Sequence, residues 1–332
     1  MGKEVKRTMP TERELPTSAP LAEPTRERAT VEASVDRFLG DEVHKARDLL
    51  AVEEPLELQL GYGPIHLRKL KSISVTMRTP GHDFELAAGF LMTEGVVVDS
   101  ADIIEISYVA GRNNRFDSQS DESLRAGDVV LPYQPERNIV RVDLGPEVSV
   151  RLSNLERNFY TTSSCGICGK ASLLALRTVC PPRAVNRLQV RADLLYSLPD
   201  KLRSAQNVFD RTGGLHAAGL FDAEAQLYSV REDVGRHNAV DKLLGAEFLA
   251  DRTPLRDRLL LLSGRASFEL LQKALMGGIA MVVSVGAPSS LAVQVAKEFD
   301  ITLVGFLRED HFNVYHGAER ILGGFGAGRE RK

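Results

Sequence analysis

The sequence predicts an α/β protein in which a three-layer α/β/α domain follows a smaller, strand-rich α+β domain. Residues 56–60 alternate apolar and polar side chains with a period of two, which is typical of a half-buried strand. Residues 259–262 and 281–283 lie in short, continuously apolar stretches, as strands buried on both faces do. After residue 212, strand patterns alternate with helix patterns, which indicates a partly parallel sheet covered by helices.

The first half of the chain predicts a tail and one domain. Residues 1–50 are rich in Glu, Arg, Pro and Thr without a sustained period, so we expect a disordered tail with a short helix near residues 35–50. The strand-rich domain is expected over residues 51–160, with antiparallel pairing. Its strands are predicted at residues 56–60, 65–77, 103–110 and 128–152, and its helix at residues 84–93 with Asp83 as the cap.

The second domain is expected over residues 161–325 and contains the alternating pattern. Its strands are predicted at residues 215–221, 226–231, 258–262, 279–285 and 301–306. Its helices are predicted directly after residue 170 and at residues 198–211, 237–249, 267–276 and 289–299.

Composition limits the functional classes. The formal net charge of -3 provides no overall basic surface for nucleic acid. The chain contains no apolar run of membrane-spanning length and no apolar segment of a signal peptide near its start. With only three cysteines, it is therefore expected in the reducing cytoplasm, without membrane or nucleic-acid partners.

Two of the three cysteines form a Cys-Gly-Ile-Cys motif at Cys165 and Cys168. An apolar helical pattern follows directly, so both thiols are expected at or just before a helix N-terminus. There the unpaired N–H groups and the helix dipole favour an anion, and can lower a thiol pKa from about 8.5 to roughly 3.5–7.5. Lys170 adds a positive charge. The pattern predicts an exposed, partly ionised thiolate on a glycine-rich turn.

Other roles for the two cysteines remain open at this stage. A structural disulfide is disfavoured in a chain so poor in cysteine. A zinc site needs two further ligands, and the chain has no second Cys-x-x-Cys motif. A thiol oxidoreductase would use the same pair, but the motif lacks a thioredoxin-like βαβ context.

Marked loops follow most of the predicted strands of the second domain. In open α/β sheets, ligands bind beyond the carboxyl ends of the strands. Small hydroxyl or glycine residues at the helix starts offer N–H groups to phosphate, and Arg236, Arg265 and Arg308 add fork-shaped donors. Together they predict a pocket for a large anionic ligand such as a nucleotide. The alternative for each residue alone is ordinary: a serine that caps its helix, or a solvated arginine.

Two histidines flank these loops. His216 lies in a strand pattern, where a hydrogen-bonded core histidine is the default, whereas His237 lies at a loop–helix junction beside Asp233. Asp233 is expected to cap the helix or orient His237, and Asp241 and Lys242 to form surface contacts. Zinc nucleobase deaminases use a His-x-Glu motif, but this chain has Ala218 in the glutamate position, so deaminase chemistry is disfavoured.

Five ordered motifs resemble the formate dehydrogenase accessory sulfurtransferases, the FdhD/NarQ family. They are Ser-Cys-Gly-Ile-Cys-Gly at 164–169, Thr-Gly-Gly-Leu-His-Ala-Ala at 212–218, Glu-Asp-Val-Gly-Arg-His-Asn-Ala-Val-Asp-Lys at 232–242, Ser-Gly-Arg-Ala-Ser at 263–267 and Leu-Val-Gly-Phe at 303–306. The resemblance covers roughly residues 55–325. It implies a C-terminal domain similar to the cytidine-deaminase fold and a homodimer.

The resemblance also implies a function. A cysteine desulfurase would pass persulfide sulfur to Cys165, with Cys168 assisting, and the sulfur would reach the molybdenum of a bis(molybdopterin guanine dinucleotide) cofactor destined for formate dehydrogenase. The alternative is a cofactor-binding chaperone that transfers no sulfur, and neither role needs a metal of the protein's own. The expected cofactor-binding residues are Arg236, His237, Gly264, Arg265, Phe306, Leu307, Arg308, Glu309, Asp310 and His311. Glu309, Asp310 and His311 depart from the Pro, Gly and Arg of some members.

Overall fold

The computed structural model describes residues 29–109, 137–150, 176–177, 180 and 186–323. Cys165 and Cys168 lie outside the described residues, as does the polar segment at residues 111–127. Of the helix predicted directly after residue 170, only residues 176 and 177 are described, and both are helical. No helix in the described ranges has both the length and the apolar character needed to cross a membrane.

The C-terminal domain contains a six-stranded sheet in the order β13-β12-β11-β10-β8-β9. Its central strands β10 (Leu259–Leu262), β11 (Met281–Ser284) and β12 (Thr302–Gly305) are parallel, and every residue in them is buried. β8 (His216–Phe221), β9 (Leu227–Asp233) and β13 (Asn313–His316) pair antiparallel. The predicted partly parallel sheet is confirmed, and β13 was not foreseen because its four residues are only half-buried or exposed.

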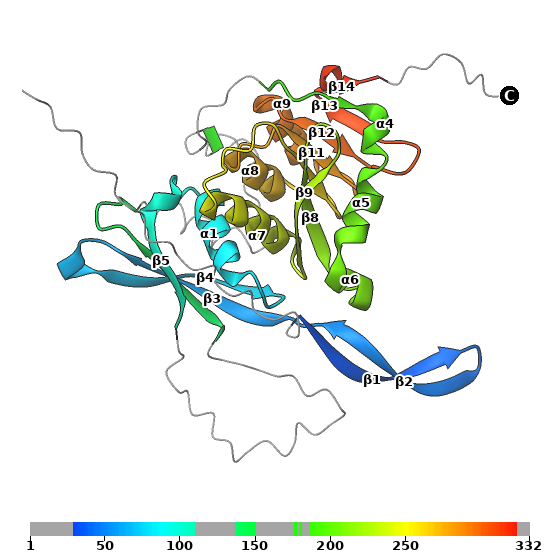
Figure 1. The fold of residues 1–332 in the computed structure, drawn as a ribbon, viewed down its shortest axis with the longest axis horizontal. Helices are drawn as coiled ribbons and strands as arrows, with labels where there is room; N and C mark the ends of the chain where they lie inside the picture. Colours follow the sequence, from blue (N-terminus) through cyan, green and yellow to red (C-terminus); the bar gives the residue numbers. More distant parts are fainter. Residues whose placement is uncertain (1–28, 110–136, 151–175, 178–179, 181–185, 324–332) are drawn as a thin grey trace, which may run out of the picture.

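Helices cover both faces of this sheet, which confirms the three-layer architecture (Figure 1). The crossover helices α7 (Arg236–Leu249), α8 (Phe268–Met276) and α9 (Ser290–Glu298) share one core with one face. Helices α4 (Ala192–Leu195) and α5 (Leu198–Ala205) pack on the other, beside the short pair β7 (Val190–Arg191) and β14 (Ile321–Leu322).

The single helix predicted at residues 198–211 is wrong in one respect. The chain leaves the helical conformation at Gln206, whose φ and ψ are -85° and 82°, and a second helix, α6 (Asn207–Thr212), follows. Gln206 lies between the two helices and is buried. The helical periodicity of the sequence therefore continues through this residue, although the helix itself is interrupted there.

The N-terminal domain is a four-stranded sheet in the order β4-β3-β6-β5, with helix α1 (Asp83–Thr93) on one face. Its strands are β3 (Glu54–Tyr62), β4 (Lys69–Arg78), β5 (Ile103–Tyr108) and β6 (Ile139–Leu144). The prediction of antiparallel pairing holds for β3–β4 and β5–β6, but β3 and β6 are parallel. The prediction paired strands that are neighbours in the sequence. It missed the β3–β6 pair because these two strands are far apart in the chain, with a long polar segment before β6.

We predicted a disordered tail over residues 1–50 with a short helix near residues 35–50. This prediction is wrong for residues 30–50, which form two strands and a turn. β1 (Thr30–Leu39) and β2 (Glu42–Ala51) form an antiparallel hairpin that projects from the body (Figure 1). Gly40 makes the turn with a φ of 65°, a value that glycine adopts without strain. Charged side chains pair across the strands, as Asp36 and Lys45 do at 2.7 Å, so the segment looked polar and aperiodic although it is paired.

The two domains meet where α1 crosses α7, at Gly89 and Gly245. A Cβ atom added at Gly89 would lie 1.9 Å from the carbonyl oxygen of Asp241, and one added at Gly245 would lie 1.9 Å from that of Glu85. Backbones can approach this closely only where both residues lack a side chain. One continuous core consequently runs from the four-stranded sheet through both helices to the six-stranded sheet.

The crossing of α1 and α7 buries charged side chains that we expected at the surface. Asp241 and Lys242 are buried; Lys273 lies 2.9 Å from Asp241, and Lys242 lies 2.6 Å from Asp233. The expectation of surface contacts is therefore wrong, because α1 covers this side of α7. Burial acts to lower the pKa of Lys273, but the Asp241 and Glu94 carboxylates outweigh it and raise that pKa, so the ammonium stays charged.

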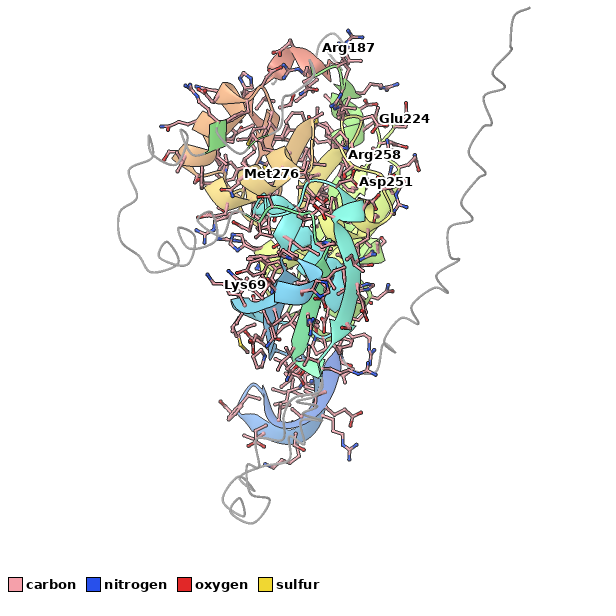
Figure 2. All side chains as sticks on the ribbon, turned by 90° about the vertical axis from the view of Figure 1, so that its left-hand side faces the viewer. Lys69, Arg187, Glu224, Asp251, Arg258 and Met276 are labelled. Atoms are coloured by element: carbon pink, nitrogen blue, oxygen red, sulfur yellow. The ribbon has the colours of Figure 1, made fainter. Side chains whose placement is uncertain are left out.

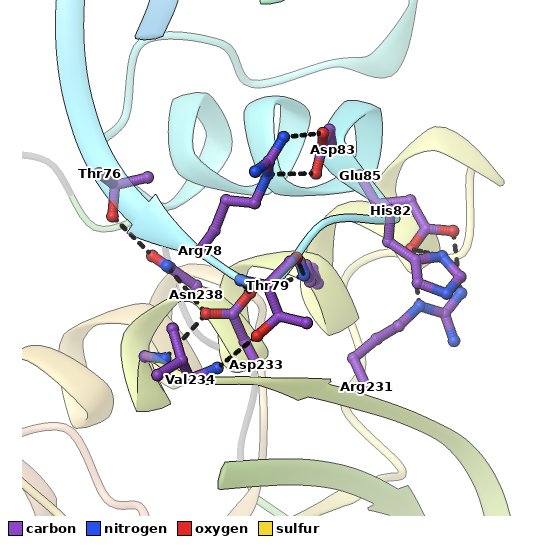
Figure 3. Close-up of polar contacts among 12 residues, drawn as sticks. Thr76, Arg78, Thr79, His82, Asp83, Glu85, Arg231, Asp233, Val234 and Asn238 are labelled. Carbon is purple, nitrogen blue, oxygen red and sulfur yellow. Dashed lines mark hydrogen bonds and ion pairs between the residues drawn. The ribbon is translucent and has the colours of Figure 1, made fainter. Parts of the chain in front are cut away.

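A second pair of contacts ties β9 to α1 near the crossing. Arg231 donates to both carboxylate oxygens of Glu85, at 2.6 and 2.9 Å, and His82 lies 2.9 Å from the same carboxylate (Figure 3). Burial acts to raise the pKa of Glu85, yet these two partners lower it to about 2. The carboxylate is thus ionised throughout the neutral range and holds the domains together.

Replacing Gly245 by alanine tests the crossing. Alanine normally stabilises a helix relative to glycine, but here its Cβ meets backbone that cannot move without shifting α1. We expect the free energy of unfolding, measured with urea, to fall by about 3 kcal/mol. Gly214→Ala is the matched control, because its nearest neighbour is Ala51 Cβ at 3.6 Å. Equal effects of both substitutions would contradict a tight crossing.

Candidate functional site

Five segments of the C-terminal domain meet at one edge of the six-stranded sheet. The parallel strands β10, β11 and β12 end there, β9 ends beside them, and the antiparallel β8 begins there. We call this region the strand-end edge and define it as residues 213–216, 234–237, 263–267, 285–289 and 306–308. The loops that the sequence singled out therefore lie together, since parallel strands bring their carboxyl ends to the same edge.

Backbone hydrogen bonds join three of these segments into one unit. The Gly286 N–H donates to the Gly264 carbonyl at 2.9 Å, and the Phe306 N–H donates to the Gly286 carbonyl at 3.1 Å. A Cβ atom added at Gly286 would lie 2.9 Å from the Arg265 nitrogen and from the Gly264 carbonyl, so this position requires glycine. Gly264, Arg265 and Phe306 are consequently held in fixed relative positions.

His216 lies against the same unit. A Cβ atom added at Gly264 would be 3.5 Å from His216 Cε1 and Nδ1, so the imidazole packs over this glycine. The Ser263 hydroxyl accepts a 2.9 Å hydrogen bond from the Ala217 N–H, and this contact ties the start of β8 to the loop after β10. Partial desolvation of the ring by its neighbours, followed by the positive charge of Arg236, lowers the pKa of His216. The ring is exposed at the edge and is not the core histidine that its strand pattern suggests by default.

His237 occupies the first turn of α7 and is held neutral. Burial, followed by the positive charges of Lys273 and Arg236, lowers the pKa of His237 to about 4, against an opposing effect of Glu269. Its Nε2 atom is buried, and no hydrogen-bond partner reaches it from the described part of the chain. A neutral imidazole presents one donor and one acceptor, which suits contact with a polar ligand atom or a thiol.

Asp233 anchors the loop before His237, and among the described residues no hydrogen bond joins the two side chains. Its Oδ1 accepts from the Gly235 N–H at 2.8 Å and from Asn238 Nδ2 at 3.1 Å, while its Oδ2 accepts from the Thr79 N–H at 3.1 Å (Figure 3). Lys242 Nζ, 2.6 Å from Oδ2, completes the shell. The predicted capping role is wrong, because the N-cap of α7 is Gly235 and no side chain caps that helix. Asp233 instead fixes the turn before α7, which carries Arg236 and His237.

Sequence reasoning missed Glu269, which lies in the first turn of α8. Burial acts to raise the pKa of its carboxyl, but its own backbone N–H and the positive charge of Arg236 are among the groups that lower it overall. An acidic residue in a first helical turn usually complements the helix dipole, so the sequence offered no separate signal. Glu269 places a negative charge close to His237 and Arg236.

The segment after β12 divides into a fixed part and an exposed part. Phe306 has a φ of 54° and is 38% exposed, whereas the Leu307 side chain is buried in the core rather than at the edge. Arg308 Nη1 donates to the Val285 carbonyl at 2.7 Å and to the Leu307 carbonyl at 2.8 Å, so its guanidinium remains beside the loop after β11.

The last three expected cofactor-binding residues are exposed. Asp310 and His311 lie 2.6 Å apart, and the Arg308 N–H donates to the His311 carbonyl at 2.9 Å, which closes a turn around Glu309. Of the residues expected to bind the cofactor, the structure therefore brings Arg236, His237, Gly264, Arg265, Phe306 and Arg308 to the strand-end edge and its margin. Within the described ranges, no group of three or more His, Cys, Asp or Glu side chains is arranged to hold a metal ion.

These features define an α/β protein in which polar and cationic side chains gather where the strands of a six-stranded sheet end, and in which a four-stranded sheet shares a core with the larger one. The chain belongs to the FdhD/NarQ family, whose model matches residues 51–322.

Two relatives and one solved structure agree with this membership. The sulfur carrier protein FdhD of Streptomyces coelicolor is 48% identical over 89% of this chain and 96% of its own length. That of Mycobacterium tuberculosis is 47% identical over 88% of this chain and 99% of its own. The fold is also that of a crystal structure provisionally described as a formate dehydrogenase accessory protein, from Desulfotalea psychrophila, with a TM-score of 0.62, 22% identity, and coverage of 89% of this chain and 100% of the other.

Arg236→Gln tests the electrostatics of the strand-end edge. Removing a positive charge near His237 makes its imidazolium form less unfavourable, so the pKa of His237, followed by nuclear magnetic resonance, should rise from its low value of about 4. Arg265→Gln removes the same charge from a neighbouring loop and should leave this pKa in place. A rise of equal size in both variants would mean that general charge, and not local contact, sets the titration.

Proposed function

We propose that the chain is a sulfur carrier for the molybdenum cofactor of formate dehydrogenase. In this proposal it accepts persulfide sulfur from a cysteine desulfurase and transfers it to the molybdenum of bis(molybdopterin guanine dinucleotide), as a cytoplasmic sulfurtransferase that acts as a homodimer. The observation that carries the proposal is the Cys-Gly-Ile-Cys motif at 165–168 in a chain with one other cysteine. The relatives named sulfur carrier protein FdhD, about half identical over nearly their full length, support it.

The first transfer needs only a nucleophilic thiolate. The Cys165 thiolate attacks the outer sulfur of the donor's persulfide, the donor's S–S bond breaks, and the donor cysteine leaves as a thiolate. Cys165 then carries the persulfide. Cys168 assists release: its thiolate attacks the inner sulfur of Cys165, a Cys165–Cys168 disulfide forms, and the outer sulfur departs as sulfide with the bonding electron pair. A thiol reductant then reopens the disulfide.

The strand-end edge would hold the cofactor, which is the substrate of this reaction. The phosphates of the cofactor would accept hydrogen bonds from the guanidinium groups of Arg236, Arg265 and Arg308 and from the backbone at Gly264. Backbone hydrogen bonds hold Gly264, Arg265 and Phe306 in fixed relative positions, which would reduce the entropic cost of association. Neutral His237, with Nε2 buried at the same edge, would supply a polar contact without adding charge.

A cofactor-binding chaperone that transfers no sulfur is the second candidate. The observation that favours it is the strand-end edge itself, which glycines, Asp233 and backbone hydrogen bonds organise within the described part of the chain. It predicts that formate dehydrogenase still matures with a Cys165→Ala variant, whereas the sulfur carrier predicts loss of maturation with cofactor binding retained.

Intact-mass analysis after incubation with a cysteine desulfurase and cysteine tests the proposal. We expect a gain of one sulfur atom that peptide mapping places on Cys165 and that Cys165→Ala abolishes. Cys180→Ala is the matched control and should gain the sulfur like the wild-type chain. An unmodified wild-type protein, or sulfur that persists in the Cys165→Ala variant, would refute transfer through this residue.

A further inference from the structure

Exposed apolar side chains concentrate on the N-terminal strands. In the described part of the chain fifteen large apolar side chains are exposed, and nine of them lie between Phe38 and Met77. Scattered single residues of this kind are normal on a protein surface, but a concentration along one structural element marks an interaction site. The element here is a long ribbon, since only Val52 and Glu53 separate β2 from β3.

One end of the ribbon is apolar and acidic. The hairpin tip, which we define as residues 36–45, exposes Phe38 at 69%, Leu39 at 63% and Val43 at 53%. Its formal charge is -1, because three acidic residues outnumber two basic ones. Asp36 is already paired with Lys45, so Asp41 and Glu42 give the turn its negative character. A two-stranded ribbon is marginally stable by itself and gains from a partner.

The other end is apolar and basic. The β3–β4 turn, which we define as residues 63–71, exposes Ile65, Leu67 and Leu70 at 73%, 73% and 55%. Its formal charge is +3, from one arginine and two lysines. Arg68 is already paired with Asp143 at 2.8 Å, so Lys69 and Lys71 give the turn its positive character. In Figure 2 the Lys69 side chain lies at the level of the four-stranded sheet, and the hairpin projects below it.

The two ends cannot meet within one molecule. Figure 1 shows the β3–β4 end on the left and the β1–β2 end on the right, with the shared ribbon between them. In a two-fold symmetric pair, however, a patch that contacts a different patch on its partner receives the same contact in return. Two ribbons related in this way lie side by side in opposite directions, and each acidic tip reaches the other copy's basic turn.

We propose that, in the homodimer of the proposed function, on which this inference rests, the hairpin tip of one copy docks reciprocally on the β3–β4 turn of the second copy. The occupant is a second copy because the complement of each patch, in charge sign and in apolar character, is present on this same chain. Each contact would cover three large apolar side chains from one copy with three from the other, and the contact repeats about the axis. The surrounding charges fix the orientation, since like ends repel.

Charge reversal tests the pairing in the full-length chain by sedimentation equilibrium. The tip variant combines Asp41→Lys and Glu42→Lys, and the turn variant combines Lys69→Glu and Lys71→Glu. Each variant alone sets like charges against each other in both contacts and should weaken dimerisation by about tenfold or more. An equimolar mixture of the two should form dimers within about threefold of the wild-type affinity, because both contacts then join opposite charges.

Combining all four substitutions in one chain should also restore the dimer. Circular dichroism and the melting temperature check that these exposed positions leave the fold intact. A wild-type chain that stays monomeric at all concentrations, a dimer indifferent to the single variants, or a mixture that fails to recover affinity would overturn the proposal. So would a hairpin tip that binds a cysteine desulfurase or formate dehydrogenase while the chain itself remains monomeric.

Discussion

The close contact of two helical glycines determines much of the rest of this structure. Gly89 and Gly245 let α1 lie directly on α7, so the strand-rich domain covers one side of the α/β domain with a shared core. Burial of Asp233, Asp241 and their lysine partners follows, and a buried charge is tolerated only when it is paired. The ionic contacts are thus a consequence of the crossing, and their loss one at a time would leave an uncompensated charge inside the protein.

The packing of the two domains also affects the strand-end edge, through hydrogen bonds to Asp233. This carboxylate accepts hydrogen bonds from Thr79 of the N-terminal domain and from Gly235 at the start of α7. The turn that carries Arg236 and His237 is therefore set by both domains. Lys273, which pairs with Asp241 beneath the crossing, also helps to keep His237 neutral. A change in the domain contact would therefore shift the pKa of His237 without any direct contact with that residue.

The sequence revealed what depends on local pattern. The apolar runs of β10 and β11 identified strands buried on both faces, and parallel pairing then required the loops after them to meet at one edge. It could not reveal the burial of Asp241 and Lys242, because the helix that covers them lies some 150 residues earlier in the chain. The role of Glu269 was hidden for a related reason: an acidic first-turn residue has an ordinary explanation, and only the fold brings Arg236 beside it.

The central claim is that sulfur on Cys165 and a cofactor at the strand-end edge belong to one reaction. A chase experiment tests it most directly: protein loaded with radiolabelled persulfide sulfur is mixed with the molybdenum cofactor, and the label is followed for a single turnover. The account predicts that label moves to the cofactor fraction in the wild-type chain but remains on the protein in Gly286→Val, which disrupts the fixed unit of Gly264, Arg265 and Phe306. Label that leaves equally fast without cofactor, or equally well from the Gly286→Val variant, would contradict it.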